Sequence, residues 1–244
     1  RPGMGRVLQA TKDLSPGELI LVEEPLISWV NGKIAECVSK IQKMSTQQRQ
    51  QLMDMYHLKY GEKARFDSCE ARMEEYRALA RMVPQACLIP DDAPDEHQDA
   101  GPPWAATYEA LNVMKLNTHC ISSLPWEMQE VDDVQRMLPQ GAPRVTRVAL
   151  FPLASKAAHS CVPNCVWTTQ NPYGHISYFA ARPIAAGDAI TMSYVAPASA
   201  APTLERWANT AFSKDFICTC PQCSGPDATR AVKCAHCADG VAMP

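Results

Sequence analysis

The chain has 244 residues, of which 46% are hydrophobic and 20% are charged, and this composition excludes a disordered or fibrous protein. Its formal net charge of -3 argues against broad non-specific binding to nucleic acid, so we predict no direct nucleic-acid contact. The sequence contains no apolar run near the roughly 20 residues that span a bilayer. It also shows no secretory leader pattern, and we therefore predict no membrane contact.

The start of the chain predicts β-strands. Residues 5–28 contain a turn signal at 15–17 and the apolar run 19–22, and Pro25 is expected to end this stretch. The chain begins at Arg1 rather than Met and stops soon after a second cysteine pair. We therefore expect it to be a fragment of a longer protein.

Helices are predicted next. Apolar residues at helical spacing predict four of them, over residues 34–41, 45–55, 73–80 and 104–116. Ser45 and Gln48 form a capping-box pattern at the start of the second helix. Between the last two helices, residues 84–103 are rich in proline and acidic residues, which predicts a solvated loop.

Short strands return in the second half of the chain. They are predicted at 147–151, 166–169, 176–181 and 189–193. Turn signals lie at 172–174 and near Gly187, and Thr203 is predicted to cap a helix that extends to Phe212. Strands at both ends with helices between them predict an α+β domain that contains a helical insertion.

The cysteines indicate metal binding. The chain has eleven of them, an odd number, and five lie at C-x-C and C-x-x-C spacings: Cys218, Cys220, Cys223, Cys234 and Cys237. This spacing favours metal thiolates in the reducing cytoplasm or nucleus over disulfides. The first three would supply three of the four ligands of a tetrahedral structural zinc. The last two suggest half of a second zinc site, whose other ligands would be His236, an upstream cysteine or residues after Pro244.

Three segments occur in order in the second half of the chain. They are residues 159–164 (HSCVPN), residues 190–194 (ITMSY) and the cluster Cys218-x-Cys220-x-x-Cys223. Together they resemble the core of a SET domain with its zinc-binding post-SET tail, in the SMYD-like branch of the protein-lysine methyltransferases. The resemblance implies an α+β SET-domain fold of short β-sheets, with a helical insertion and a cysteine-rich tail. It divides the chain into SET parts at 1–29 and 111–199, an insertion at 30–110 and a post-SET segment at 200–244.

The resemblance also implies a reaction and the residues that serve it. SET domains transfer a methyl group from S-adenosylmethionine to a lysine amine, so the implied partner is a protein or peptide that bears a lysine, and the enzyme would act as a monomer. Tyr194 is the implied catalytic residue, because such an in-line transfer depends on alignment of methyl and amine. The implied cofactor-binding residues are Gly3, Met4, Gly5, Asn117, Ser155, Ala158, His159, Tyr194 and Phe216. Cys161 is the implied fourth zinc ligand beside Cys218, Cys220 and Cys223, and Cys165 competes for that position.

The sequence departs from the family pattern at three places. Ala158 stands where the family usually has a cofactor-contacting asparagine, and Lys214 stands where it has a second tyrosine. Residues 29–110 contain three cysteines and no C-x-x-C pair, so the MYND zinc finger of SMYD proteins is predicted to be absent.

Two other classes of function therefore stay open beside the enzyme. The first is a SET-fold interaction module that is catalytically impaired and keeps its zinc. The second is a zinc-stabilised structural domain without a cofactor. Taken alone, Tyr194 would be a packing residue, Asn117 a helix cap and His159 a structural histidine.

Overall fold

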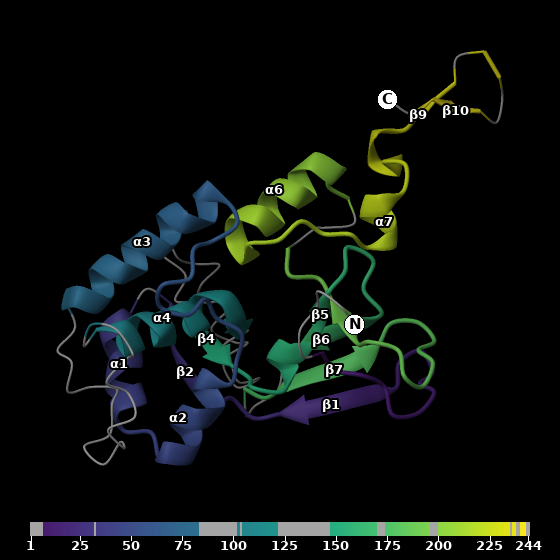
Figure 1. Cartoon of the computed structure of the whole chain (residues 1–244). Helices are drawn as coiled ribbons and strands as arrows, with labels where there is room; N and C mark the ends of the chain where they lie inside the picture. The colour runs from purple at the N-terminus through teal and green to yellow at the C-terminus, as the bar shows by residue number, and fades with distance from the viewer. Residues whose placement is uncertain are drawn as a thin grey trace, which may run out of the picture.

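The computed structural model describes residues 7–31, 33–82, 102, 104–121, 147–169, 174–195, 200–234, 236–237 and 240–242. Small β-sheets lie beside a group of helices, so the α+β prediction is confirmed (Figure 1). Within these residues no helix is both long and apolar enough to cross a membrane.

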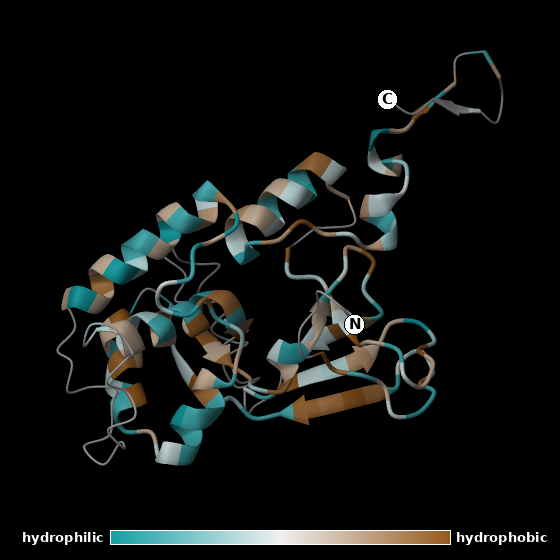
Figure 2. Cartoon of the chain, viewed as in Figure 1, coloured by the Kyte–Doolittle hydropathy of each residue, from teal (hydrophilic) through white to brown (hydrophobic). Residues whose placement is uncertain are grey.

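A three-stranded antiparallel sheet forms the body of the domain. Its strands, in spatial order, are β1 (Leu19–Glu23), β7 (Ile176–Ala180) and β6 (Cys165–Thr168). The turn before β1 depends on Gly17, whose φ of 81° lies in the left-handed region that glycine adopts without strain. Side chains alternate along β7, so that Ile176, Tyr178 and Ala180 are buried in the core of the body. The brown colour of β1 in Figure 2 marks it as hydrophobic over most of its length.

A second three-stranded sheet separates the body from the helices. Its strands, in spatial order, are β2 (Ile27–Val30), β4 (Arg147–Leu150) and β3 (His119–Ile121). On β4, Val148 and Leu150 belong to the helical core whereas Ala149 belongs to the core of the body. As predicted, the strand formed by the apolar run 19–22 ends before Pro25, at Glu23, and a strand of the second sheet, β2, begins two residues after the proline. The proline lies between two strands of different sheets, where its missing N–H costs no ladder bond.

Four helices pack against this second sheet, and together they form what we call the helical segment. They are α1 (Ile34–Gln42), α2 (Thr46–Met53), α3 (Asp67–Met82) and α4 (Ala105–Asn117). The predicted capping box is present: the Ser45 hydroxyl accepts from the Gln48 N–H at 3.2 Å, and the Gln48 side chain accepts from the Ser45 N–H at 3.0 Å. The proline-rich loop predicted at 84–103 lies outside the described residues except for Pro102.

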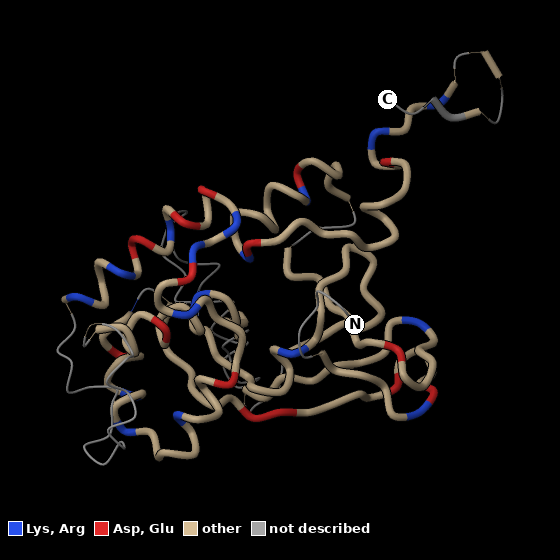
Figure 3. Tube along the Cα trace, viewed as in Figure 1, with Lys and Arg blue, Asp and Glu red and all other residues tan. Residues whose placement is uncertain are grey.

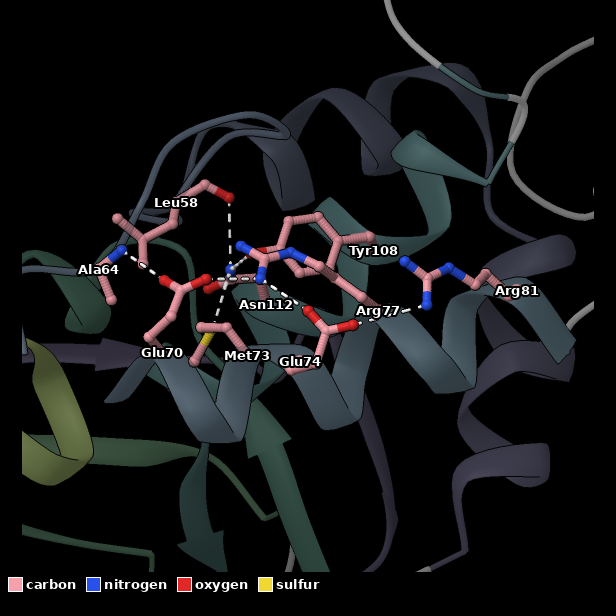
Figure 4. A network of polar contacts seen from close by, with 9 residues as sticks. All are labelled: Leu58, Ala64, Glu70, Met73, Glu74, Arg77, Arg81, Tyr108 and Asn112. Carbon is pink, nitrogen blue, oxygen red and sulfur yellow. Dashed lines mark hydrogen bonds and ion pairs between the residues drawn. The ribbon is translucent and has the colours of Figure 1, made fainter. Parts of the chain in front are cut away.

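Polar contacts order the outer helix α3 and its packing on α4. Charged residues of both signs alternate along α3 (Figure 3). Arg77 pairs with Glu70 at 2.5 Å and with Glu74 at 3.0 Å, and the buried Asn112 amide of α4 donates to the Tyr108 hydroxyl at 3.2 Å (Figure 4). The Asn112 amide also lies 3.2 Å from the sulfur of Met73 in α3, and this contact joins the two helices.

A two-stranded parallel pair joins two segments that are far apart in the chain. β5 (Ala158–His159) pairs with β8 (Thr191–Met192), with Ala158 opposite Thr191 and His159 opposite Met192. The predicted strand at 189–193 is thus shorter than expected, although Ala189 makes an isolated bridge with Gln9. The pairing brings two of the three sequence motifs side by side.

The C-terminal tail comprises residues 200–242. Its elements are α6 (Thr203–Lys214), α7 (Pro221–Ser224), a 3-10 turn η5 (Ala228–Arg230) and the hairpin β9 (Val232–Lys233) with β10 (Val241–Ala242). Helix α6 lies beside α3, and the β9–β10 hairpin projects away from the rest of the molecule (Figure 1). The predicted cap at Thr203 is wrong in detail, because Thr203 is the first helical residue. Its N–H donates instead to the Asp227 carboxylate at 2.7 Å.

Candidate functional site

The site begins where the β5–β8 pair ends. Tyr194 follows β8 by two residues, and its backbone N–H donates to Nδ1 of His159 at 3.0 Å. Its hydroxyl donates to the carbonyl of Ala157 at 2.6 Å. Residues of the segment around β5 therefore bind both the backbone and the hydroxyl of Tyr194. Burial raises the pKa of the phenol to about 12. At neutral pH Tyr194 is a hydrogen-bond donor and not a base.

His159 connects Tyr194 to the cysteine cluster. Burial, followed by the nearby charge of Lys214, lowers the pKa of His159 to about 4, so its imidazole is neutral. Because Nδ1 accepts from Tyr194, the ring proton lies on Nε2, which is 3.4 Å from the sulfur of Cys161. His159 therefore donates toward Cys161 while it orients Tyr194.

Three aromatic rings, those of His159, Tyr194 and Phe216, lie close together at this site. His159 lies 5.2 Å from Tyr194 and 5.7 Å from Phe216 between ring centroids, and Tyr194 lies 6.4 Å from Phe216 at an interplanar angle of 88°. The two contacts of Phe216 are edge-to-face, which is favourable for aromatic pairs, whereas His159 and Tyr194 are tilted at 44° to each other. Phe216 and Tyr194 form two sides of an aromatic wall whose third member is a neutral histidine.

Lys214 adds a cation to these rings. Its Nζ lies 5.2 Å from the centroid of the Tyr194 ring and donates to the carbonyl of Leu116 in α4. Burial, followed by the charges of Lys115 and Arg72, lowers the pKa of Lys214 to about 8. At neutral pH the Lys214 amine beside Tyr194 therefore stays mostly protonated, although burial disfavours its charge.

Asn164 fixes the motif that contains His159. Its side-chain oxygen accepts from the Thr191 N–H at 2.7 Å, and its amide donates to the carbonyl of Ala189 at 2.8 Å. Its own backbone N–H donates to the Thr191 hydroxyl at 3.0 Å. This residue clamps the two motifs together, which explains why an asparagine stands there.

The other predicted cofactor residues lie on several different elements. Ala158 is buried in β5, where its N–H donates to Ile190, and it presents no polar side chain. The hydroxyl of Ser155 is buried and has no hydrogen-bond partner among the described residues. Asn117, at the end of α4, donates its amide to the carbonyls of Tyr56 and Val113, at 2.7 and 2.8 Å. The predicted Gly3, Met4 and Gly5 lie outside the described residues.

Four cysteines converge below the rings. The sulfurs of Cys161, Cys218, Cys220 and Cys223 all lie within 4.8 Å of one another. Cys161 is 3.8 Å from Cys218 and 3.5 Å from Cys223 between sulfur atoms. Sulfurs about 2.3 Å from a tetrahedral zinc are about 3.8 Å apart, so the donor set fits zinc. Cys165, the competing ligand, faces the core of the body instead.

The pKa values of these thiols are shifted in different directions. Burial raises the pKa of Cys218 to about 11. Burial also acts to raise the pKa of Cys220, but bonds from the backbone of Cys161 and Cys223 lower it to about 6. Cys220 is thus poised as a thiolate, and a metal would have to displace protons from Cys161 and Cys218, whose pKa values burial raises.

Sequence reasoning missed two residues that shape the tail. Arg206 is fully buried and contacts the sulfur of Cys223, and Asp215 adopts the left-handed backbone conformation with φ of 60° at the end of α6. Both are charged residues in a helix of ordinary amphipathic pattern, so nothing local distinguishes them. Their burial arises only from contacts with distant parts of the chain.

The remaining cysteines form no further group. Cys234 and Cys237 lie in the β9–β10 hairpin, and no third metal-ligating side chain joins them among the described residues. Cys37 and Cys69 are buried separately in the helical core, and Cys87 lies outside the described residues. The described part of 29–110 thus contains no cysteine pair of the kind that a MYND finger requires.

Comparison with known proteins agrees with this geometry. Residues 5–195 match the SET domain family. The chain is also similar to a SET and MYND domain-containing protein of Dictyostelium discoideum, with 33% identity over 78 residues, which is 32% of this chain and 19% of that protein. The chain thus matches only about a fifth of that relative's length. With most of its length matched by the family, and its two central motifs joined through β5 and β8, the chain belongs to the SET domain family.

Proposed function

We propose that this protein is an S-adenosylmethionine-dependent protein-lysine N-methyltransferase. SET-domain proteins typically methylate lysine side chains, and the chain belongs to that family. The observation that carries the proposal is the position of Tyr194, which is held between the Ala157 carbonyl and His159 beside the Phe216 ring. This arrangement suits the alignment of two reactants, which is the main requirement of methyl transfer.

The described residues fit a sulfonium cofactor and a lysine acceptor. When bound, S-adenosylmethionine would supply the electrophilic methyl group. The unpartnered hydroxyl of Ser155 offers a hydrogen bond, and Ala158 leaves room without adding one. The faces of Tyr194 and Phe216 can attract a cation, whether sulfonium or ammonium. Gly3, Met4 and Gly5 remain part of the proposed cofactor site.

The chain's own residues also act on the proton of the acceptor. A lysine must lose its proton before it attacks, and the charge of Lys214 disfavours a second ammonium beside Tyr194. The Tyr194 phenol keeps its own proton at neutral pH and so orients the amine without deprotonating it. We therefore expect the proton to leave to solvent.

We further propose that the four converging cysteines bind one structural zinc. Their sulfur separations match a tetrahedral thiolate site. The zinc would connect the tail to β5 through Cys161 and thereby hold Phe216 and Lys214 near Tyr194. Elemental analysis of the purified protein should find one zinc per chain, and a metal-free protein would contradict the assignment. The same proposal includes a reducing location in the cytoplasm or nucleus, a monomeric state and a protein partner that bears a lysine.

The decisive experiment combines binding with turnover. Calorimetry should show that zinc-loaded protein binds S-adenosylmethionine, and arrayed lysine peptides should accept labelled methyl groups from it. Tyr194→Phe keeps the ring, so folding and zinc content should survive. Methyl transfer should fall roughly a hundredfold, because one orienting contact at the reacting centre is lost. Cofactor affinity should change far less than the rate.

A matched control is Tyr108→Phe, which removes a buried phenol in the helical segment far from the rings. It should leave methyl transfer at the wild-type rate. An unchanged rate in Tyr194→Phe would make Tyr194 a packing residue. Failure of the wild type to bind the cofactor would replace the enzyme with a SET-fold interaction module.

A further inference from the structure

Arg206 in α6 is an unusual buried charge. Its side chain has no exposed surface, and its guanidinium donates to the Thr203 hydroxyl at 2.7 Å, to the Gln222 carbonyl at 3.3 Å and to the Ala201 carbonyl. Its Nε lies 3.4 Å from the sulfur of Cys223. The guanidinium is therefore well supplied with hydrogen-bond acceptors, most of which carry no charge.

The charge itself is not balanced by a close carboxylate. Among the described residues, the carboxylate that pairs with Arg206 is Asp227, and its oxygen lies 3.9 Å away. Both oxygens of Asp227 already accept other bonds, one from the Thr203 N–H and one from Thr229. An ionised group removed from water is costly unless an opposite charge lies close to it. The other source of negative charge in direct contact is the cysteine cluster.

The cluster gains this charge when it binds a metal. Each cysteine that binds a metal does so as a thiolate, and four thiolates around a divalent ion carry a net charge of -2. An N–H bond to a metal-bound sulfur stabilises that excess of negative charge, as partners outside the ligand set commonly do. Arg206 would reduce the net charge of the buried site to -1.

We propose that Arg206 is the buried counter-ion of the cysteine cluster, so that metal binding and the docking of α6 stabilise each other. This inference rests on the zinc site of the proposed function. It adds a positioning residue that is not a ligand, and it joins the metal to the helix that carries Lys214. Metal occupancy would then influence the position of Lys214 beside Tyr194.

The inference predicts opposite effects in the two metal states. Arg206→Met keeps much of the side-chain volume but removes the charge. In the zinc-loaded protein it removes the counter-ion, so zinc affinity should fall about 10- to 100-fold. In the metal-free protein it removes an uncompensated buried charge, so thermal stability should stay equal or rise. A purely structural role, limited to the bonds with Ala201, Thr203 and Gln222, would lower stability equally in both states.

The experiment measures zinc affinity by competition with a chromophoric chelator, and melting temperature with and without zinc. Arg206→Lys provides a second variant, because it keeps the positive charge and loses the planar guanidinium group with its several N–H donors. It should lie between wild type and Arg206→Met in zinc affinity. Arg77→Met is the matched control: this arginine pairs with Glu70 and Glu74 in α3, away from the cysteines. It should lower stability equally in both metal states and leave zinc affinity unchanged.

Each possible result supports or contradicts the proposed role of Arg206. A wild-type protein that binds zinc, with an Arg206→Met variant that binds it equally well, would overturn this inference and leave the zinc site intact. A loss of stability of the same size with and without zinc would assign Arg206 a structural role instead. If Arg206→Met does not fold in either state, the zinc affinity of Arg206→Lys decides between the two roles. A wild type that takes up no zinc would overturn both the zinc site and the counter-ion.

Discussion

The helical segment and the C-terminal tail differ in what they bury. The helical segment encloses large apolar side chains, among them Ile41, Leu52, Met73, Tyr108 and Leu111, each no more than 2% exposed. The buried cluster that joins the tail to the body consists of three cysteines, Cys161, Cys218 and Cys223, with partly buried side chains around it. One region is stabilised by hydrocarbon removed from water, and the other is built around sulfur.

This difference in buried side chains indicates which region depends on a bound metal for its stability. Apolar burial stabilises the helical segment under any metal condition, because the hydrophobic effect needs no ligand. A small thiol cluster gives little such stabilisation, so metal-binding energy becomes folding energy there. Polar contacts join the tail to the helices, and in one group of them the backbone N–H groups of Arg65 and Phe66, just before α3, donate to the Asp215 carboxylate.

Removal of metal should therefore have the largest effect, and it should be local. After chelation, amide hydrogens of residues 203–224 should exchange rapidly because α6 and α7 lose their anchor. Amides of α1 to α4 should keep their protection. Hydrogen exchange with mass spectrometry measures both. Equal loss of protection in the helical segment would show that the two regions are one cooperative unit.

Truncation in the helical core should act in the opposite way. Leu111→Ala, at a residue that is 2% exposed, should lower the free energy of unfolding by about 3 kcal/mol through lost burial and a new cavity. The loss should be the same with and without metal. Chemical denaturation measures it, with the exposed Leu204→Ala in the tail as a control that should change stability by less than about 0.5 kcal/mol.

Asp215 tests the junction between the two regions. Its carboxylate accepts from the Arg65 N–H at 2.7 and 2.9 Å and from the Phe66 N–H at 3.1 Å. Asp215→Ala should cost about 2 kcal/mol, because it leaves these donors unpaired and places alanine at a positive φ. Asp215→Asn should cost less, since asparagine keeps an acceptor and tolerates the left-handed backbone. Equal losses in both variants would mean that the carboxylate charge provides the stabilisation.

Lys214 should give the smallest effect, and its sign depends on pH. Its pKa is lowered to about 8 in the folded chain from 10.5, so the folded state disfavours the charged amine. Below pH 8 both states carry the proton and this penalty is present in full. Between pH 8 and 10.5 the unfolded chain binds more protons, so stability rises with pH.

Lys214→Met should consequently stabilise the protein by about 1 kcal/mol at pH 7, after allowance for its partial exposure to solvent. The gain should vanish above about pH 10.5, where both states of the wild type have lost the proton. Denaturation of variant and wild type across this range measures the difference, with the exposed Lys43→Met as control. A gain that does not change with pH would show that methionine packing, and not the charge, is responsible.

The sequence by itself determined the local elements and the order of the motifs. Some features depend only on residues close in sequence, so the sequence alone predicts them. They are the helical period, the Ser45–Gln48 capping box and the alternation along 176–180. The SET resemblance came from short segments in order, and the α+β class came from strand patterns at both ends of the chain with helical patterns between them. An error arose where a local signal had a distant partner: Thr203 does not cap α6, and its N–H donates to the Asp227 carboxylate instead.

Only the tertiary structure decided which residues meet at the site. His159 and Tyr194 are joined through the parallel β5–β8 pair, whose register no local pattern specifies. Cys161 joins the tail cysteines, whereas Cys165, the first residue of β6, belongs to the core of the body. The burial of Arg206 likewise arises when α6 packs over the cysteines. Such contacts join residues that are distant in sequence, and their energies depend on burial and geometry that appear only after the chain has folded.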